Sequence, residues 1–155
     1  MSPYLAAKWL HVLSSTILFG TGLGSAYYMF FASRSGDPRV VAHVARRVVV
    51  ADWVFTTTTI VFQPLSGLYL AHVAHFPLAS FWIVASFALY LVAGACWVPV
   101  VFIQMRMHRI AEEAAARGTP LPPLYGTLFA VWTALGIPAF FALVVVFWLM
   151  VAKPA

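Results

Sequence analysis

Four long apolar stretches dominate this chain of 155 residues, at about residues 4–32, 47–73, 79–105 and 125–152. Each is long enough to cross the ~30 Å hydrocarbon core of a bilayer, which takes roughly 20 helical residues. A backbone in lipid must satisfy its own hydrogen bonds, and these stretches are much longer than barrel strands, so each is expected to be a helix. The sequence therefore predicts an all-α membrane protein, a single domain folded as an antiparallel bundle of four transmembrane helices.

The arginines predict the orientation of this bundle. All seven lie in or beside the first and third connections, at about residues 33–46 and 106–124: Arg34, Arg39, Arg46, Arg47, Arg106, Arg109 and Arg117. The opposite side carries only Lys8 and Lys153. Because cytoplasmic loops collect Lys and Arg, both connections are expected in the cytoplasm and both termini in the periplasm. The net charge of +5 thus indicates topology and contact with anionic lipid, and nucleic-acid binding is not expected.

His11 is the most informative polar residue in a predicted span. It lies about seven residues into the first stretch, roughly 10 Å below the outer surface at 1.5 Å per residue, and Ser15 follows on the same face. An ionisable side chain inside a membrane is by default a functional candidate. A neutral imidazole can ligate haem iron or relay a proton, or it can form a hydrogen bond that only fixes packing. These interpretations stay open from the residues alone.

Polar residues also follow one face of the second stretch. Asp52, Thr56, Thr59, Gln63 and Ser66 recur at helical spacing. Gln63 has a predicted depth similar to that of His11, so the two are expected to meet, either as an interhelical polar clasp or as part of a cofactor pocket.

Asp52 lies nearer the cytoplasmic surface, shortly after Arg46 and Arg47. Buried charge is tolerated mainly when it is paired, so Asp52 is expected to have a structural role and to pair with an arginine. Gln104, on the third stretch, is expected to be a structural polar residue as well.

Aromatic residues recur on one face of the third stretch, among them Trp82, Tyr90 and Trp97. Such a stripe usually packs against neighbouring helices, but it can also wall a flat macrocycle. His72 and His75, at the outer end of the second stretch, have the i,i+3 spacing of two metal ligands, and form a weaker candidate site. Helical phase places His72 on the face opposite Gln63, which favours His11 with Gln63 over His11 with His72.

Several motifs spread along the chain resemble a bacterial family of small predicted integral membrane proteins of unknown function. They are Lys8–Leu13, Ala51–Phe55, Gln63–Pro64, Trp97–Val100, Gln104–Met107 and Lys153–Pro154. This resemblance covers nearly the whole chain and implies the bacterial inner membrane as its location.

That family is in turn distantly similar to HemJ-type protoporphyrinogen oxidases and to CopD-type copper-resistance membrane domains. An early Leu-His pair, here Leu10–His11, and a Val-rich last helix that ends in Lys-Pro carry the similarity to the HemJ type. The similarity implies haem b held by His11, and a porphyrinogen oxidase-like activity with a porphyrin substrate or a quinone as partner. Only His11 carries over directly, and the middle of the chain departs from the HemJ-type pattern.

Three functions follow as hypotheses. The first is a membrane redox protein that binds b-type haem or a related porphyrin in the outer half of the bundle. His11 would be the axial ligand, Ser15 and Gln63 polar neighbours, and Trp82, Tyr90 and Trp97 the walls. The second is a CopD-like copper-binding protein, and the third a noncatalytic subunit or assembly factor, in a homo-oligomer or a larger membrane complex.

Overall fold

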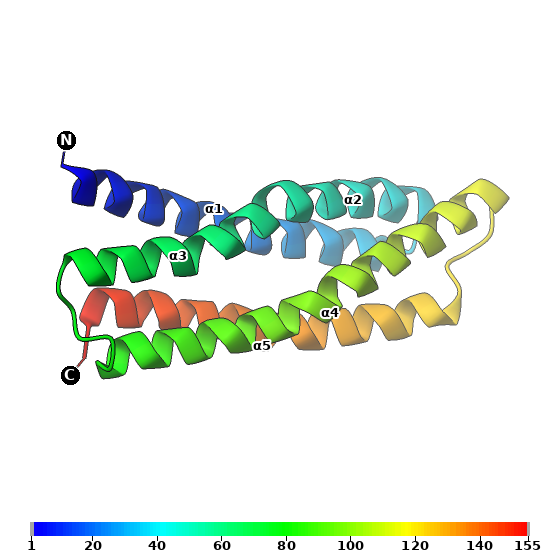
Figure 1. The fold of residues 1–155 in the computed structure, drawn as a ribbon. Coiled ribbons are helices and arrows are strands. Elements are labelled where there is room, and N and C mark those ends of the chain that lie inside the picture. Colours follow the sequence, from blue (N-terminus) through cyan, green and yellow to red (C-terminus); the bar gives the residue numbers. More distant parts are fainter. Residues whose placement is uncertain (1, 155) are drawn as a thin grey trace.

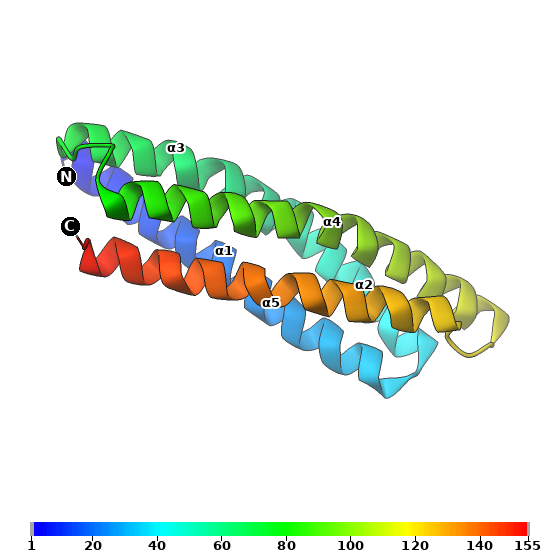
Figure 2. The ribbon, with the colours of Figure 1, turned by 90° about the horizontal axis from the view of Figure 1, so that it is seen from below.

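The structure, a computed structural model that describes residues 2–154, is all helical in that part of the chain. Its elements are α1 (Pro3–Ser35), α2 (Pro38–Ala51), the π-helix η1 (Asp52–Thr56), α3 (Thr57–Val73), α4 (Phe81–Arg117) and α5 (Pro123–Ala152). Because α2, η1 and α3 follow one another without a break, they form one helical rod. Four rods thus run side by side, and both ends of the chain lie at the same end of the molecule (Figures 1 and 2).

Three of the rods are long and apolar enough to cross a membrane: Pro38–Val73, Phe81–Arg117 and Pro123–Ala152. The prediction of an all-helical protein with several membrane-spanning helices is therefore confirmed. α1 has 33 residues but does not belong to this set within the described chain. Its polar and small residues, such as Ser14, Thr16 and Gly20, lower its mean hydropathy. That α1 also crosses the membrane stays a prediction.

The helices extend through much of both expected cytoplasmic connections, and the true links are short. α1 ends at Gly36, whose φ of 70° suits glycine, and the Asp37 side chain then accepts a hydrogen bond from the Arg39 backbone N–H at 2.8 Å to start α2. α4 likewise ends at Gly118, with φ of 64°. Near that end Arg117 and Glu113 form an i,i+4 ion pair at 3.9 Å, which supports the helix outside the apolar stretch.

The most completely buried apolar residues gather towards the end with these two links. They form a cluster of Met29, Val41, Ala45, Val48, Met107, Ala111, Tyr125 and Trp132. In lipid such packing stabilises helix association through close van der Waals contact, since lipid tails are as apolar as the side chains. The rest of the interior, from the middle of the rods to the chain termini, contains polar side chains and two cavities.

Candidate functional site

His11 is held in one orientation by Ser66 on α3. The His11 Nδ1 and Ser66 Oγ atoms lie 2.7 Å apart, and Ser66 Oγ donates its own proton to the Phe62 carbonyl, also at 2.7 Å. A hydroxyl has a single proton to donate, so with Ser66 donating to Phe62 its oxygen can accept a hydrogen bond from Nδ1–H of His11. In that tautomer the lone pair on Nε2 is free. No hydrogen bond to Nε2 occurs among residues 2–154.

Two further contacts join α1 to α3 at His11. The Gln63 side-chain amide donates a hydrogen bond to the His11 backbone carbonyl at 2.9 Å, so the structure brings together the two residues that were expected to meet. Gly67 faces the ring so closely that a Cβ at this position would lie 3.4 Å from His11 Cε1. A glycine at this point allows α3 to approach the imidazole.

A cavity of about 440 Å³ extends from His11 towards the chain termini, and we call it the His11 cavity. Ser15, Gln63, Trp82 and Tyr90 line it with His11, so five of the six residues predicted for the cofactor pocket share one cavity. Aromatic, cationic and sulfur-containing side chains complete the lining, including Phe87, Phe147, Lys8, Lys153 and Met150. Lys153 Nζ lies 4.6 Å from the centre of the Phe76 ring and 5.6 Å from that of Trp82.

Tyr90 also supplies a hydrogen bond that the α3 backbone lacks. Pro64 lies inside α3 and has no N–H, so the carbonyl of Ile60, four residues earlier, lacks its helical partner. The Tyr90 hydroxyl donates a hydrogen bond to this carbonyl at 2.7 Å. In a membrane such a replacement is needed because lipid offers no donor.

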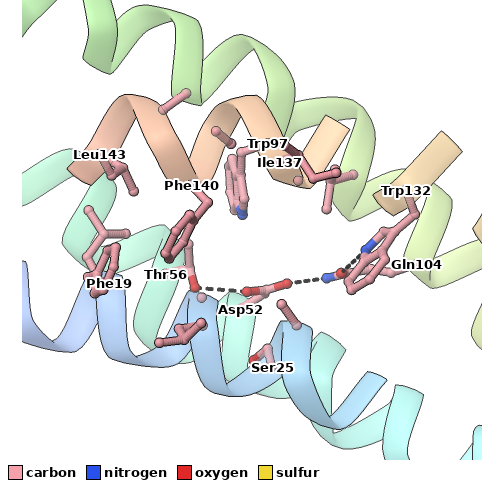
Figure 3. A pocket seen from close by; sticks show the side chains of 18 of the residues that line it. Phe19, Ser25, Asp52, Thr56, Trp97, Gln104, Trp132, Ile137, Phe140 and Leu143 are labelled. Atoms are coloured by element: carbon pink, nitrogen blue, oxygen red, sulfur yellow. Dashed lines mark hydrogen bonds between the residues drawn. The ribbon is translucent and has the colours of Figure 1, made fainter. Parts of the chain in front are cut away.

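A second polar site is centred on Asp52, at the start of η1. The Trp132 indole N–H donates to Gln104 Oε1 at 3.3 Å, and this contact sets the orientation of the Gln104 amide. Its Nε2 then donates to Asp52 Oδ2, while Thr56 Oγ1 donates to Asp52 Oδ1 at 2.8 Å (Figure 3). Both carboxyl oxygens therefore accept hydrogen bonds, a pattern that a carboxylate can satisfy.

The expected pairing of Asp52 with an arginine is wrong. Among residues 2–154 the Arg117–Glu113 ion pair and the His108–Glu112 contact both lie on α4 and exclude Asp52, and Arg46 and Arg47 are exposed on α2. Asp52 is only 6% exposed, and it accepts hydrogen bonds from its own helical rod and from α4. Gln104 is 2% exposed, and its structural role stays a prediction.

Asp52 lines another cavity, of about 460 Å³, which we call the Asp52 cavity. Trp97, predicted to wall the His11 pocket, lines this cavity instead, because it lies seven residues, roughly 10 Å, beyond Tyr90 along α4. The Trp97 indole nitrogen is buried without a hydrogen-bond partner and points into the cavity (Figure 3). Tyr90, Leu18, Phe19 and Leu143 line both cavities, so the two are neighbours.

His72 and His75 do not join either site. Both are exposed at the end of α3 and line neither cavity, in keeping with the helical phase that set His72 opposite Gln63. Among residues 2–154 no group of three or more His, Cys, Asp or Glu side chains could hold a metal ion. The structure therefore offers no support for a copper site at these histidines.

Four features of the two sites were not predicted as such. Ser66 belongs to the polar face of the second apolar stretch, but its bond to His11 needs the relative rotation of two helices. Lys153 is far from His11 in sequence, and only the return of α5 to the chain ends brings it to the cavity. Neither the π-helical turn at Asp52 nor the donor role of Trp132 has a signal in the sequence pattern.

Comparison with known families identifies one match, over residues 5–154, to a family described as predicted integral membrane protein (DUF2269). Comparison with curated proteins and with solved structures gives no match. The family match covers nearly the whole chain and agrees with the long apolar helices described above. The chain belongs to this family of predicted integral membrane proteins.

Proposed function

We propose that this protein is a membrane redox protein that binds haem b or a related porphyrin in the His11 cavity. The observation that carries the proposal is the 2.7 Å contact between His11 Nδ1 and Ser66 Oγ, which suits a tautomer with Nδ1–H donated to Ser66 and the Nε2 lone pair free. Metal-bound histidines characteristically donate their other ring N–H to a neighbouring acceptor, which orients the ring and raises the basicity of the ligating nitrogen.

The cavity has the chemistry that a porphyrin requires. Its volume of about 440 Å³ falls in the range of small-molecule pockets, and Trp82, Phe87 and Phe147 offer flat apolar walls. Lys8 and Lys153 line the same cavity and can pair with the two propionates of haem b. Met150 lines the cavity as well, and its thioether sulfur could help His11 to hold haem iron.

The protein's own contribution is to bind, orient and insulate the cofactor. A bound haem would supply one-electron transfer, whereas Ser66 would set the basicity of His11 and the apolar walls would exclude water. In this proposal α1 is a fourth transmembrane helix in an antiparallel bundle in the bacterial inner membrane. Because the arginines gather towards the end with the two short links, the opposite end, with both termini and the His11 cavity, lies on the periplasmic side.

The optical spectrum of protein purified in detergent from haem-replete cells tests the proposal. We expect a Soret band that is lost in His11→Ala and retained in the control His72→Ala, which removes an exposed histidine outside the cavity. Folding of each variant is checked by helical circular dichroism. Colourless folded protein, or a Soret band that survives in His11→Ala, would overturn the proposal.

A noncatalytic subunit or assembly factor is the competing function. It is favoured by one observation, that the Gln63 bond to the His11 carbonyl fixes helix packing whether or not a cofactor binds. That function predicts colourless protein, and a loss of stability without spectral change in His11→Ala. The same spectrum therefore separates the two.

A further inference from the structure

The Asp52 cavity contains two polar groups whose bonding capacity is not used. Asp52 is an acceptor for Thr56 and Gln104, but a carboxylate has about four lone-pair positions, so two remain. The Trp97 indole N–H, on the other side, is a buried donor with no partner. Within residues 2–154, no Lys, Arg or His side chain lines the cavity. Buried polar groups are usually hydrogen-bonded, so this donor and this acceptor in one cavity favour a ligand that has both an acceptor and a donor.

The cavity opens sideways, between α1 and α5. Tyr27 on α1 and Phe141 on α5 both line it, yet they are 59% and 60% exposed. In a chain with spanning helices this side faces lipid, so a ligand can enter from the bilayer. Aromatic side chains such as Phe19, Phe140 and Trp132 form much of the wall, which favours a ligand with an aromatic ring.

We propose that the Asp52 cavity is a binding site for an aromatic lipid with a ring hydroxyl, of the hydroquinone class. A hydroxyl group donates one hydrogen bond and accepts others, so it offers both the donor that Asp52 can still accept from and the acceptor that Trp97 Nε1 lacks. A lipophilic cation would pair with the carboxylate, but it would leave the Trp97 N–H without an acceptor. This site is separate from His11, and the proposal does not depend on haem.

The test compares two ligands by isothermal titration calorimetry of the detergent-solubilised protein, without oxygen. The probe is 2-decyl-1,4-hydroquinone, and the matched control is its 1,4-dimethyl ether, which keeps the ring, tail and oxygen acceptors but has no hydroxyl donor. We expect the hydroquinone to bind at least about tenfold more tightly, as a hydrogen bond to a charged acceptor implies.

Variants then assign the difference to residues. Asp52→Asn should bring the ratio of the two affinities towards one. Trp97→Phe, which keeps an aromatic ring but removes the N–H, should weaken both ligands about fivefold. Trp148→Phe is the matched control, since Trp148 is exposed on α5 and lines neither cavity.

Three results would overturn the proposal. The first is equal affinity of hydroquinone and ether in the unmodified protein, which needs no variant and therefore holds even if Asp52→Asn fails to fold. The second is a ratio that persists in folded Asp52→Asn. The third is binding of tetraphenylphosphonium that requires Asp52 when the hydroquinone does not bind, which would identify a cation site.

Discussion

The His11 and Asp52 sites lie in neighbouring cavities and differ in the number of hydrogen bonds made by their central side chain. At His11 the ring bonds to Ser66 through Nδ1, and Nε2 has no partner among residues 2–154. At Asp52 a chain of donors runs from Trp132 through Gln104 and ends, with Thr56, on the carboxyl group. Both sites join helices that are far apart in sequence, yet one presents a ring nitrogen to its cavity and the other a carboxyl group.

The difference shows how a small membrane protein can keep polar groups in its interior. A neutral group needs a single well-placed partner, and the neighbouring helix supplies it. A charge in the same surroundings needs several donors, and here they come from η1 and α4, with Trp132 of α5 bonded to the α4 donor Gln104. In the π-helical turn the Thr57 hydroxyl also donates to the Asp52 backbone carbonyl at 3.0 Å. Four sets of substitutions test the contrast, in order of decreasing effect.

The largest effect is expected for Gln104→Leu. It removes a donor from a buried charge and should lower the free energy of unfolding by about 2–3 kcal/mol. The matched change Gln63→Leu removes a bond to a neutral carbonyl and should cost about 1 kcal/mol or less, as is usual in membranes. Unfolding in mixed micelles measures both. Equal costs would contradict a charged Asp52.

Ser66→Ala should weaken the proposed haem binding without abolishing it. Loss of the acceptor for Nδ1–H frees the ring, and loss of such a partner typically lowers metal affinity 10- to 100-fold. Haem titration followed at the Soret band gives the affinity. Ser86→Ala is the control, because Ser86 lines the same cavity but donates to the Trp82 carbonyl and not to His11. Similar losses in both variants would argue against a specific role for Ser66.

Tyr90→Phe should cost about 1 kcal/mol of stability, since it leaves the Ile60 carbonyl without a donor. The cost should largely disappear when Pro64→Ala is already present, because alanine restores the N–H that this carbonyl lacks. A double-mutant cycle measured by micellar unfolding tests this dependence. Additive costs would show that Tyr90 stabilises α3 in some other way.

His72→Ala and His75→Ala should have the smallest effects. Both side chains are exposed and outside the cavities, so stability should stay within about 0.5 kcal/mol and cofactor binding should not change. Unfolding and the optical spectrum measure the two quantities. Loss of the Soret band in either variant would show that this histidine, outside the His11 cavity, is needed to bind the haem.

The sequence predicts helices better than it predicts their contacts. Apolar length alone indicated the helical class, and helical periodicity correctly set Gln63 near His11 and His72 away from it. Helical periodicity shows on which face of its own helix a residue lies. It does not show how the neighbouring helix is rotated about its axis. The predicted arginine partner of Asp52 was therefore wrong, because packing of α4 brings Gln104 to the carboxyl group, with the Gln104 amide in turn bonded to Trp132 of α5. The prediction that Trp97 lines the His11 cavity was wrong for a related reason, since the aromatic stripe along α4 passes both cavities.

The most direct test of the central claim is the nitrogen-15 NMR spectrum of histidine-labelled protein in micelles, with His11 assigned through His11→Ala. We expect a neutral imidazole with its proton on Nδ1, and loss of this preference in Ser66→Ala. A proton on Nε2 in the unmodified protein would leave no Nε2 lone pair for a metal and would contradict the proposed role of His11.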